Sequence, residues 1–224
     1  MRVNKLKKAR IERVDKKMRF FTKFLSLASL CLCLLVNIAF ASDLPSIAPP
    51  AAVENYNKPF INEIRAGHFA HNVYPGFIPN SLEKFEFTRW ENVNAEILFR
   101  PIDWVGEKWL GTLRPHIGAT VNFNNRENMA YAGFATTKHL FDSPVFLEAS
   151  FGLAIHDGYL SNPPAGSGLR RLGCRVQFHE SFSLGYDITE KMNVMATYEH
   201  TSNADLCEFN SGLSNAGIRM GYKF

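Results

Sequence analysis

A histidine and a serine stand two residues apart near the C-terminal end of the chain, in the stretch His200-Thr201-Ser202. An imidazole beside a hydroxyl is the combination that makes serine a nucleophile, because the ring takes the hydroxyl proton during attack on a carbonyl carbon. In an extended strand, residues i and i+2 share a face and their Cα atoms lie about 6.6 Å apart. The spacing therefore suits a base and its nucleophile, although H-x-S is common and also occurs where a strand simply runs into a loop.

The elements that must position this pair are short segments rich in aromatic and β-branched residues, separated by Gly, Pro, Asn and Asp, from about Phe60 onward. Several alternate between apolar and polar or small residues, as in PVFLEASFGLAIH and SNAGIRMGYKF. The pattern predicts an all-β chain whose strands each carry one apolar face. We expect eight strands, at roughly 61–72, 84–99, 115–124, 130–141, 144–156, 170–186, 191–202 and 214–224.

Two all-β architectures fit such strands. A sandwich or lipocalin-like barrel buries the apolar face inward, whereas an outer-membrane barrel turns it toward lipid. The strands reach the roughly 9–11 residues that cross a tilted bilayer, their number is even, and Tyr222-Lys223-Phe224 resembles the assembly signal of bacterial outer-membrane barrels. We therefore predict an eight-stranded antiparallel transmembrane β-barrel of the bacterial outer membrane.

In a barrel with both termini in the periplasm, the connections alternate between its two ends. The ones after the even strands are then periplasmic, and the ones after the odd strands, including 203–213, face outward. Parity along 191–202 places His200 and Ser202 on the lipid-facing surface, at the exterior end of their strand. Ionisable groups on such a surface are costly and call for a functional explanation.

An exported chain is predicted from the N-terminal residues. From Met18 the sequence has a basic start, an apolar core and Ala39-Phe40-Ala41 as a cleavage site before Ser42. Translation begins either at Met1, with a long basic region, or at Met18. We expect three parts: a signal peptide at 1–41, a flexible Pro/Ala-rich lead-in at 42–60, and the barrel at 61–224.

The positive net charge of the whole chain comes from the predicted signal peptide. Residues 1–41 hold ten of the 25 Lys and Arg residues and two of the 21 acids, so the remainder holds 15 basic and 19 acidic residues, a net charge of −4. The charge therefore gives no support for nucleic-acid binding.

Two cysteines, Cys174 and Cys207, lie beyond the signal. Export permits a disulfide between them, which would pin the loop next to Ser202. Two free, buried thiols are the alternative.

The C-terminal stretch His200-Thr201-Ser202-Asn203-Ala204, then Asn210-x-Gly212-Leu213, then GIRMGYKF at 217–224, resembles the H-x-S-N…N-x-G…G-Y-x-F signature of the outer-membrane lipid A 3-O-deacylases of the PagL type. Looser likeness extends upstream through 114–119 and 152–158. The resemblance implies an eight-stranded barrel that hydrolyses the ester holding the 3-position hydroxyacyl chain on lipid A of lipopolysaccharide. It also implies a serine-histidine mechanism without metal or organic cofactor.

Carried over residue by residue, the resemblance makes His200 the general base, Ser202 the nucleophile and Asn203 a side chain that helps form the oxyanion hole. The family's triad acid, a glutamate, falls on Ser214, followed by Asn215, and neither residue carries a carboxylate. Both stay candidates for orienting the site. Asp205 stands where the family has a glycine.

The predicted partners are lipid A as substrate and the outer-membrane lipid around the barrel, with the site toward the outer leaflet. The sequence leaves open whether the barrel is a monomer or a homodimer. Two other functions remain open: a non-catalytic outer-membrane barrel with an adhesive or structural role, and a soluble lipid-binding barrel.

Overall fold

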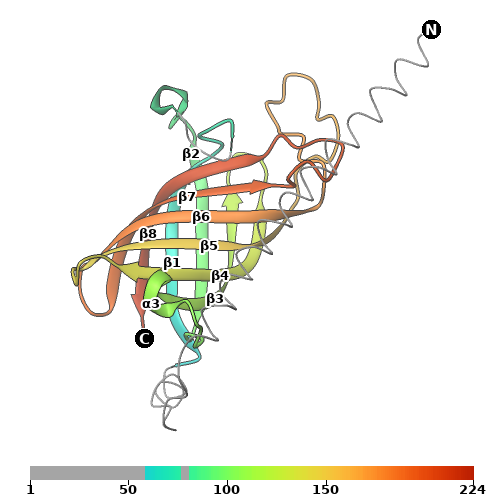
Figure 1. The fold of residues 1–224 in the computed structure, drawn as a ribbon. Helices are drawn as coiled ribbons and strands as arrows, with labels where there is room; N and C mark the ends of the chain where they lie inside the picture. The colour runs from blue at the N-terminus through green and yellow to red at the C-terminus, as the bar shows by residue number, and fades with distance from the viewer. Residues whose placement is uncertain (1–58, 77–80) are drawn as a thin grey trace. The chain divides into compact units, whose positions relative to one another are not determined.

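The computed structural model describes residues 59–76 and 81–224. The predicted signal peptide, the alternative start at Met18 and most of the lead-in lie outside these residues. The described chain is a closed barrel of eight antiparallel strands, each paired with its neighbours in sequence order and the last with the first (Figure 1). Their bounds are β1 Ile61–Ala70, β2 Trp90–Phe99, β3 Thr112–Asn122, β4 Met129–His139, β5 Val145–His156, β6 Val176–Asp187, β7 Met192–Ser202 and β8 Leu213–Lys223.

The predicted fold class and strand number are confirmed, and the starts of three strands differ from the expected ones by three residues or more. Residues 84–89 were expected in the second strand but lie before β2: Lys84 ends the short helix η1 (Leu82–Lys84), and 85–89 follow it. The third strand begins at Thr112 rather than near 115, and β6 begins at Val176 rather than near 170. All three differences fall where a strand meets a long connection. For β2 and β6 the expected strand was too long, because alternation continues into segments that do not pair in the barrel.

Charged and polar side chains fill the inside of the barrel. Arg65 lies at the centre of an ion-pair cluster, with Nε 2.8 Å from Glu63 Oε1 and Nη1 3.0 Å from Glu96 Oε2 and 2.5 Å from Glu148 Oε1. A small barrel has no room for an aqueous channel, so charges from facing strands meet and satisfy one another. The other buried charged residues of the interior strands are Arg114, Glu199 and Arg219.

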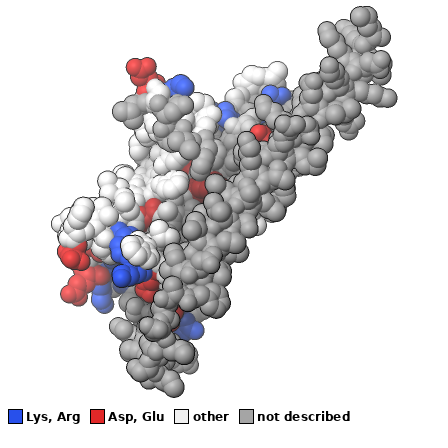
Figure 2. Space-filling model, in the orientation of Figure 1, with Lys and Arg blue, Asp and Glu red and all other residues white. Residues whose placement is uncertain are grey.

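Apolar side chains cover the outside. On β5 the exposed positions are Leu147, Phe151, Leu153 and Ile155, which alternate with inward residues. Figure 2 shows acidic and basic side chains crowded at the lower end of the visible face, the end that carries α3 (Glu107–Leu110) in Figure 1. Within residues 59–76 and 81–224, no helix is long and apolar enough to cross a membrane.

Candidate active site

His200 and Ser202 lie on the outward face of β7, as strand parity predicts. Their inward neighbours Glu199 and Thr201 are buried inside the barrel. The expectation that His200 is open to lipid is wrong, because its exposed fraction is only 4%, whereas Ser202 is half-buried. The chain that follows β1 covers the histidine.

The covering segment, residues 71–76, first extends the pairing of β1 with β8 and then turns onto the outer face of the barrel. The Asn72 N–H donates to Asn215 Oδ1 at 3.0 Å, and the Val73 N–H donates to the Ser214 carbonyl at 2.7 Å. Val73 and Tyr74 then form an apolar cluster outside the barrel with Ala70 and Ala216, against which Phe85 and Tyr198 pack. His200 therefore sits in a pocket that is walled by protein on the β8 side.

The ring of His200 is held by a chain of two hydrogen bonds. Its Nδ1 lies 2.8 Å from Ser214 Oγ, and the Ser214 hydroxyl donates to the Gly76 carbonyl at 2.9 Å. A hydroxyl has one proton, so Ser214 must accept from the histidine if it donates to Gly76. With Ser214 donating to Gly76, the neutral imidazole carries its proton on Nδ1, and Nε2 bears the lone pair that a general base needs.

Gly212 leaves room beside the Nε2 edge of the ring. A Cβ at this position would lie 3.1 Å from His200 Cε1 and 3.5 Å from Nε2, and the residue has a φ of 62°. Among the described residues, the Ser202 hydroxyl makes no hydrogen bond, including none to His200. Catalytic hydrogen bonds often form only when substrate is bound, so the shared face and spacing are what matter here.

The other predicted site residues lie apart from the ring, except Ser214. Both N–H groups of the Asn203 side-chain amide are used, since they donate to the Leu172 and Phe209 carbonyls at 2.7 Å each. In this structure the Asn203 amide joins two external loops, and its part in an oxyanion hole stays a prediction. Asn215 faces the interior, where its amide donates to Glu199 Oε1 at 2.9 Å. Of the two orienting candidates, only Ser214 reaches His200.

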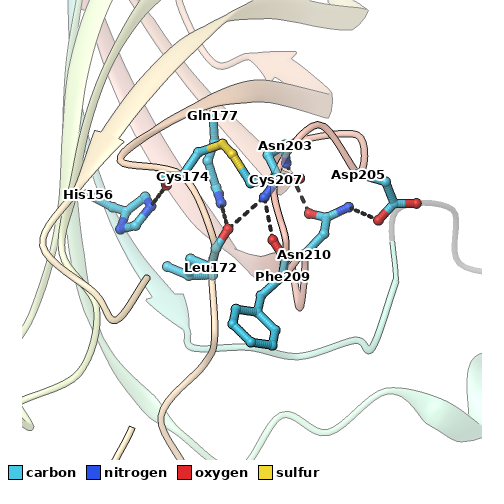
Figure 3. Close-up of a disulfide and its surroundings, with 9 residues drawn as sticks. All are labelled: His156, Leu172, Cys174, Gln177, Asn203, Asp205, Cys207, Phe209 and Asn210. Atoms are coloured by element: carbon cyan, nitrogen blue, oxygen red, sulfur yellow. Dashed lines mark hydrogen bonds between the residues drawn. A yellow bond between two sulfur atoms is a disulfide. The ribbon is translucent and has the colours of Figure 1, made fainter. Parts of the chain in front are cut away.

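A disulfide joins Cys174, just before β6, to Cys207 in the loop after β7. Figure 3 shows it beside Asn203, whose amide bridges the same two loops, and Gln177 also donates to the Leu172 carbonyl, at 2.6 Å. Asp205 has a φ of 60°, in the left-handed region that a glycine adopts without strain, and its carboxylate accepts from Asn210 at 3.1 Å. The loop that follows Ser202 is thus fixed by a covalent bond and by side-chain hydrogen bonds.

Glu127 links the connection after β1 to the connection between β5 and β6. Its carboxylate lies 3.2 Å from His71 Nε2, after β1, and accepts the Arg170 backbone N–H at 2.6 Å, between β5 and β6. The Arg170 side chain in turn donates to the carbonyls of Ser211 and Gly212. Burial acts to raise the pKa of Glu127, but the hydrogen bonds from His71 and Arg170 outweigh it and hold this pKa below its ordinary value of 4.5.

Glu127→Gln is expected to loosen these loops while the barrel stays intact. A charge-assisted hydrogen bond contributes about 1.5 kcal/mol or more, so external proteolysis of folded protein should become roughly tenfold faster at neutral pH. Because the pKa of Glu127 is depressed in the folded state, its contribution to stability is present above pH 4.5. This contribution is lost as the pH falls through the folded-state pKa. The difference between wild type and variant should therefore vanish in acid. Glu208→Gln, in an exposed part of the last external loop, is the control, and equal cleavage of E127Q and wild type at neutral pH would contradict the role.

Glu180, which was not among the predicted site residues, lies next to His200. It faces outward on β6, and the register pairs it directly with His200 on β7. The sequence contains the signal that finds it, since 176–187 alternates and Glu180 interrupts its apolar row.

An apolar groove runs along the outer face next to the site. Its floor includes the small residues Ala196 of β7 and Ala216 of β8, and Tyr198, Phe182, Phe85 and Phe87 line it as well. A groove with this lining fits a hydrocarbon chain. No group of His, Cys, Asp or Glu within the described part of the chain is placed to hold a metal ion.

Comparison with known proteins identifies the family. The family model described as lipid A 3-O-deacylase (PagL) matches residues 88–223. Among solved structures, the outer-membrane enzyme PagL is 17% identical, with 72% of this chain and 99% of that chain covered and a TM-score of 0.48. Neisserial surface protein A is 14% identical (72% and 95% covered, TM-score 0.41), and Ail of Yersinia pestis is 12% identical (74% and 100% covered, TM-score 0.39). The search of curated proteins finds no match.

Because the family model covers the chain from just before β2 to the end of β8, the chain belongs to the PagL family of lipid A 3-O-deacylases, enzymes of the bacterial outer membrane.

Proposed function

We propose that this protein removes the 3-O-linked hydroxyacyl chain of lipid A by a serine-histidine mechanism, with Ser202 as nucleophile and His200 as general base. The observation that carries the proposal is the hydrogen-bond chain from His200 through Ser214 to the Gly76 carbonyl. This chain supports the tautomer in which Nε2, the nitrogen away from Ser214, accepts a proton.

The chemistry follows in two halves. His200 Nε2 takes the proton of Ser202 as its oxygen attacks the ester carbonyl carbon, and the tetrahedral intermediate collapses when the sugar oxygen leaves with that proton. Water then gives a proton to His200 and attacks the acyl-enzyme, which releases the 3-hydroxy acid and returns the proton to Ser202. No redox step is involved, and each proton returns to its starting group.

The position of the site suits a lipid substrate. Ser202 ends β7 on the outward face, at the end of the barrel whose connections are predicted to face the cell exterior. The apolar groove leads from Tyr198 across Ala196 and Ala216. An acyl chain of outer-leaflet lipid A can lie in this groove while its ester reaches the half-buried hydroxyl.

The proposal is tested by expressing the protein in cells whose lipid A keeps its 3-O-acyl chains and recording mass spectra of the extracted lipid A. We expect a new species that lacks the mass of one 3-hydroxyacyl chain, with the free 3-hydroxy acid in the medium or membrane. An unchanged spectrum, with protein shown by heat-modifiable gel mobility to be folded in the outer membrane, would favour a non-catalytic barrel instead.

A further inference from the structure

The outward row of β6 contains one residue that does not suit a lipid-facing strand. From Val176 to Tyr186 every second residue faces outward, and this row contains a single acid, Glu180, among apolar and aromatic residues. The row reads Val176, Phe178, Glu180, Phe182, Leu184 and Tyr186. A carboxylate on the lipid-facing side of a barrel destabilises it, so its presence requires a compensating role.

The register places this carboxylate beside the base. Glu180 is paired with His200 across β6 and β7, and His200 is paired with Ser214 across β7 and β8. Directly opposed residues on one face of an antiparallel sheet have Cβ atoms about 4.5–5.5 Å apart. His200 therefore lies between a hydroxyl on one side and a carboxylate on the other, while the β5 partner of Glu180 is the apolar Phe151.

One oxygen of the Glu180 side chain lacks a hydrogen-bond partner in the resting site. Its Oε2 is shielded from solvent and has no hydrogen-bond partner among the residues that the structure describes. A buried oxygen without a partner is costly, and natural proteins keep such atoms where another state of the protein satisfies them.

The reaction creates a positive charge beside this oxygen. When Nε2 takes the proton of Ser202, His200 becomes a cation, and the two groups on its Nδ1 side, Ser214 and the Gly76 carbonyl, are neutral. The Arg170 guanidinium donates to the carbonyl of Gly212, the residue beside the His200 ring, and its positive charge opposes the new cation. A nearby carboxylate offsets this repulsion.

We propose that Glu180 supplies this carboxylate from β6, in place of an acid on β8, and so balances the imidazolium of His200 during acyl transfer. The inference rests on the serine-histidine mechanism proposed above. Glu180 acts through His200 and does not touch the substrate, so it is a positioning and charge-balancing residue. Because its oxygen is unpaired at rest and faces a cation only when the proton has moved, the interaction stabilises the transition state more than the ground state.

Glu180→Gln keeps the shape of the side chain and removes its charge. We expect kcat for release of 3-hydroxy acid from purified lipid A to fall about 100-fold, with KM unchanged, because the loss appears only after proton transfer. Glu180→Asp should restore most of the rate. Glu180→Ala should be at least as slow as E180Q alone and should regain activity in proportion to added formate, which restores a carboxylate without restoring packing.

Glu190→Gln, in the exposed turn between β6 and β7, is the matched control and should behave as wild type. Wild-type kcat in E180Q would overturn the proposal. So would a slow E180Q enzyme, folded by heat-modifiable mobility, that neither the aspartate variant nor formate restores, since Glu180 would then act through packing alone. His200→Ala separates this result from failure of the mechanism itself. A fully active H200A would contradict the serine-histidine mechanism. An inactive H200A together with a fully active E180Q would contradict only the charge-balancing role of Glu180.

Discussion

Ser202→Ala is expected to reduce lipid A deacylation by at least about 1000-fold while leaving the barrel as stable as wild type. Removal of the nucleophile of a serine hydrolase leaves only the rate that binding and electrostatic stabilisation support. The Ser202 hydroxyl is half-buried and makes no hydrogen bond among the described residues, so its loss leaves no unpaired polar group. The variant therefore separates chemistry from folding.

The measurement is the rate at which 3-hydroxy acid is released from lipid A in detergent micelles, with heat-modifiable mobility recorded on the same preparations. Ser161→Ala, in the exposed loop between β5 and β6, is the matched serine control and should keep full activity. If S202A retains more than a tenth of the wild-type rate, another group is the nucleophile.

Arg65→Met is expected to cause the largest loss of stability of any single substitution considered. Arg65 contacts Glu63, Glu96 and Glu148 inside the barrel, and methionine would leave these acids with too few cations. Breaking a buried ion pair by removing one partner costs about 3–5 kcal/mol, because the remaining charge stays buried without compensation.

Urea unfolding of the barrel in lipid vesicles, followed by tryptophan fluorescence, measures this loss. Lys191→Met, in the exposed turn before β7, is the control and should unfold with wild-type stability. Glu148→Gln added to R65M should recover part of the loss, since it removes one of the uncompensated charges. Equal stability of R65M and wild type would mean that the interior charges do not depend on Arg65.

The faces of the strands could be read from the sequence because alternation is a local property of the backbone. Parity alone places His200 and Ser202 outward and Glu199 inward, and the structure agrees. The same rule applied to 176–187 puts Glu180 outward, so its orientation was also available. What the sequence could not supply is the register between β6 and β7, which decides that Glu180 faces His200 rather than another residue.

The cover over His200 was beyond prediction for a related reason. Val73 and Gly76 lie more than 120 residues from His200 in the sequence, and backbone atoms make their contacts with Ser214. Main-chain groups are the same in every residue, so these contacts leave no mark in residue type. The start of the second strand was predicted too early for a similar reason. Phe85 packs against the apolar cluster outside the barrel and does not pair in the sheet.

The hydrogen-bond chain that sets the tautomer of His200 crosses the seam where the first and last strands meet. Gly76 belongs to the segment after β1, Ser214 belongs to β8, and Asn72 and Val73 bond across the same junction. A chain in transit, with its terminal strands still apart, lacks the assembled base. On the proposed mechanism, activity therefore depends on closure of the barrel at this junction, because the closed junction holds the base in its working position.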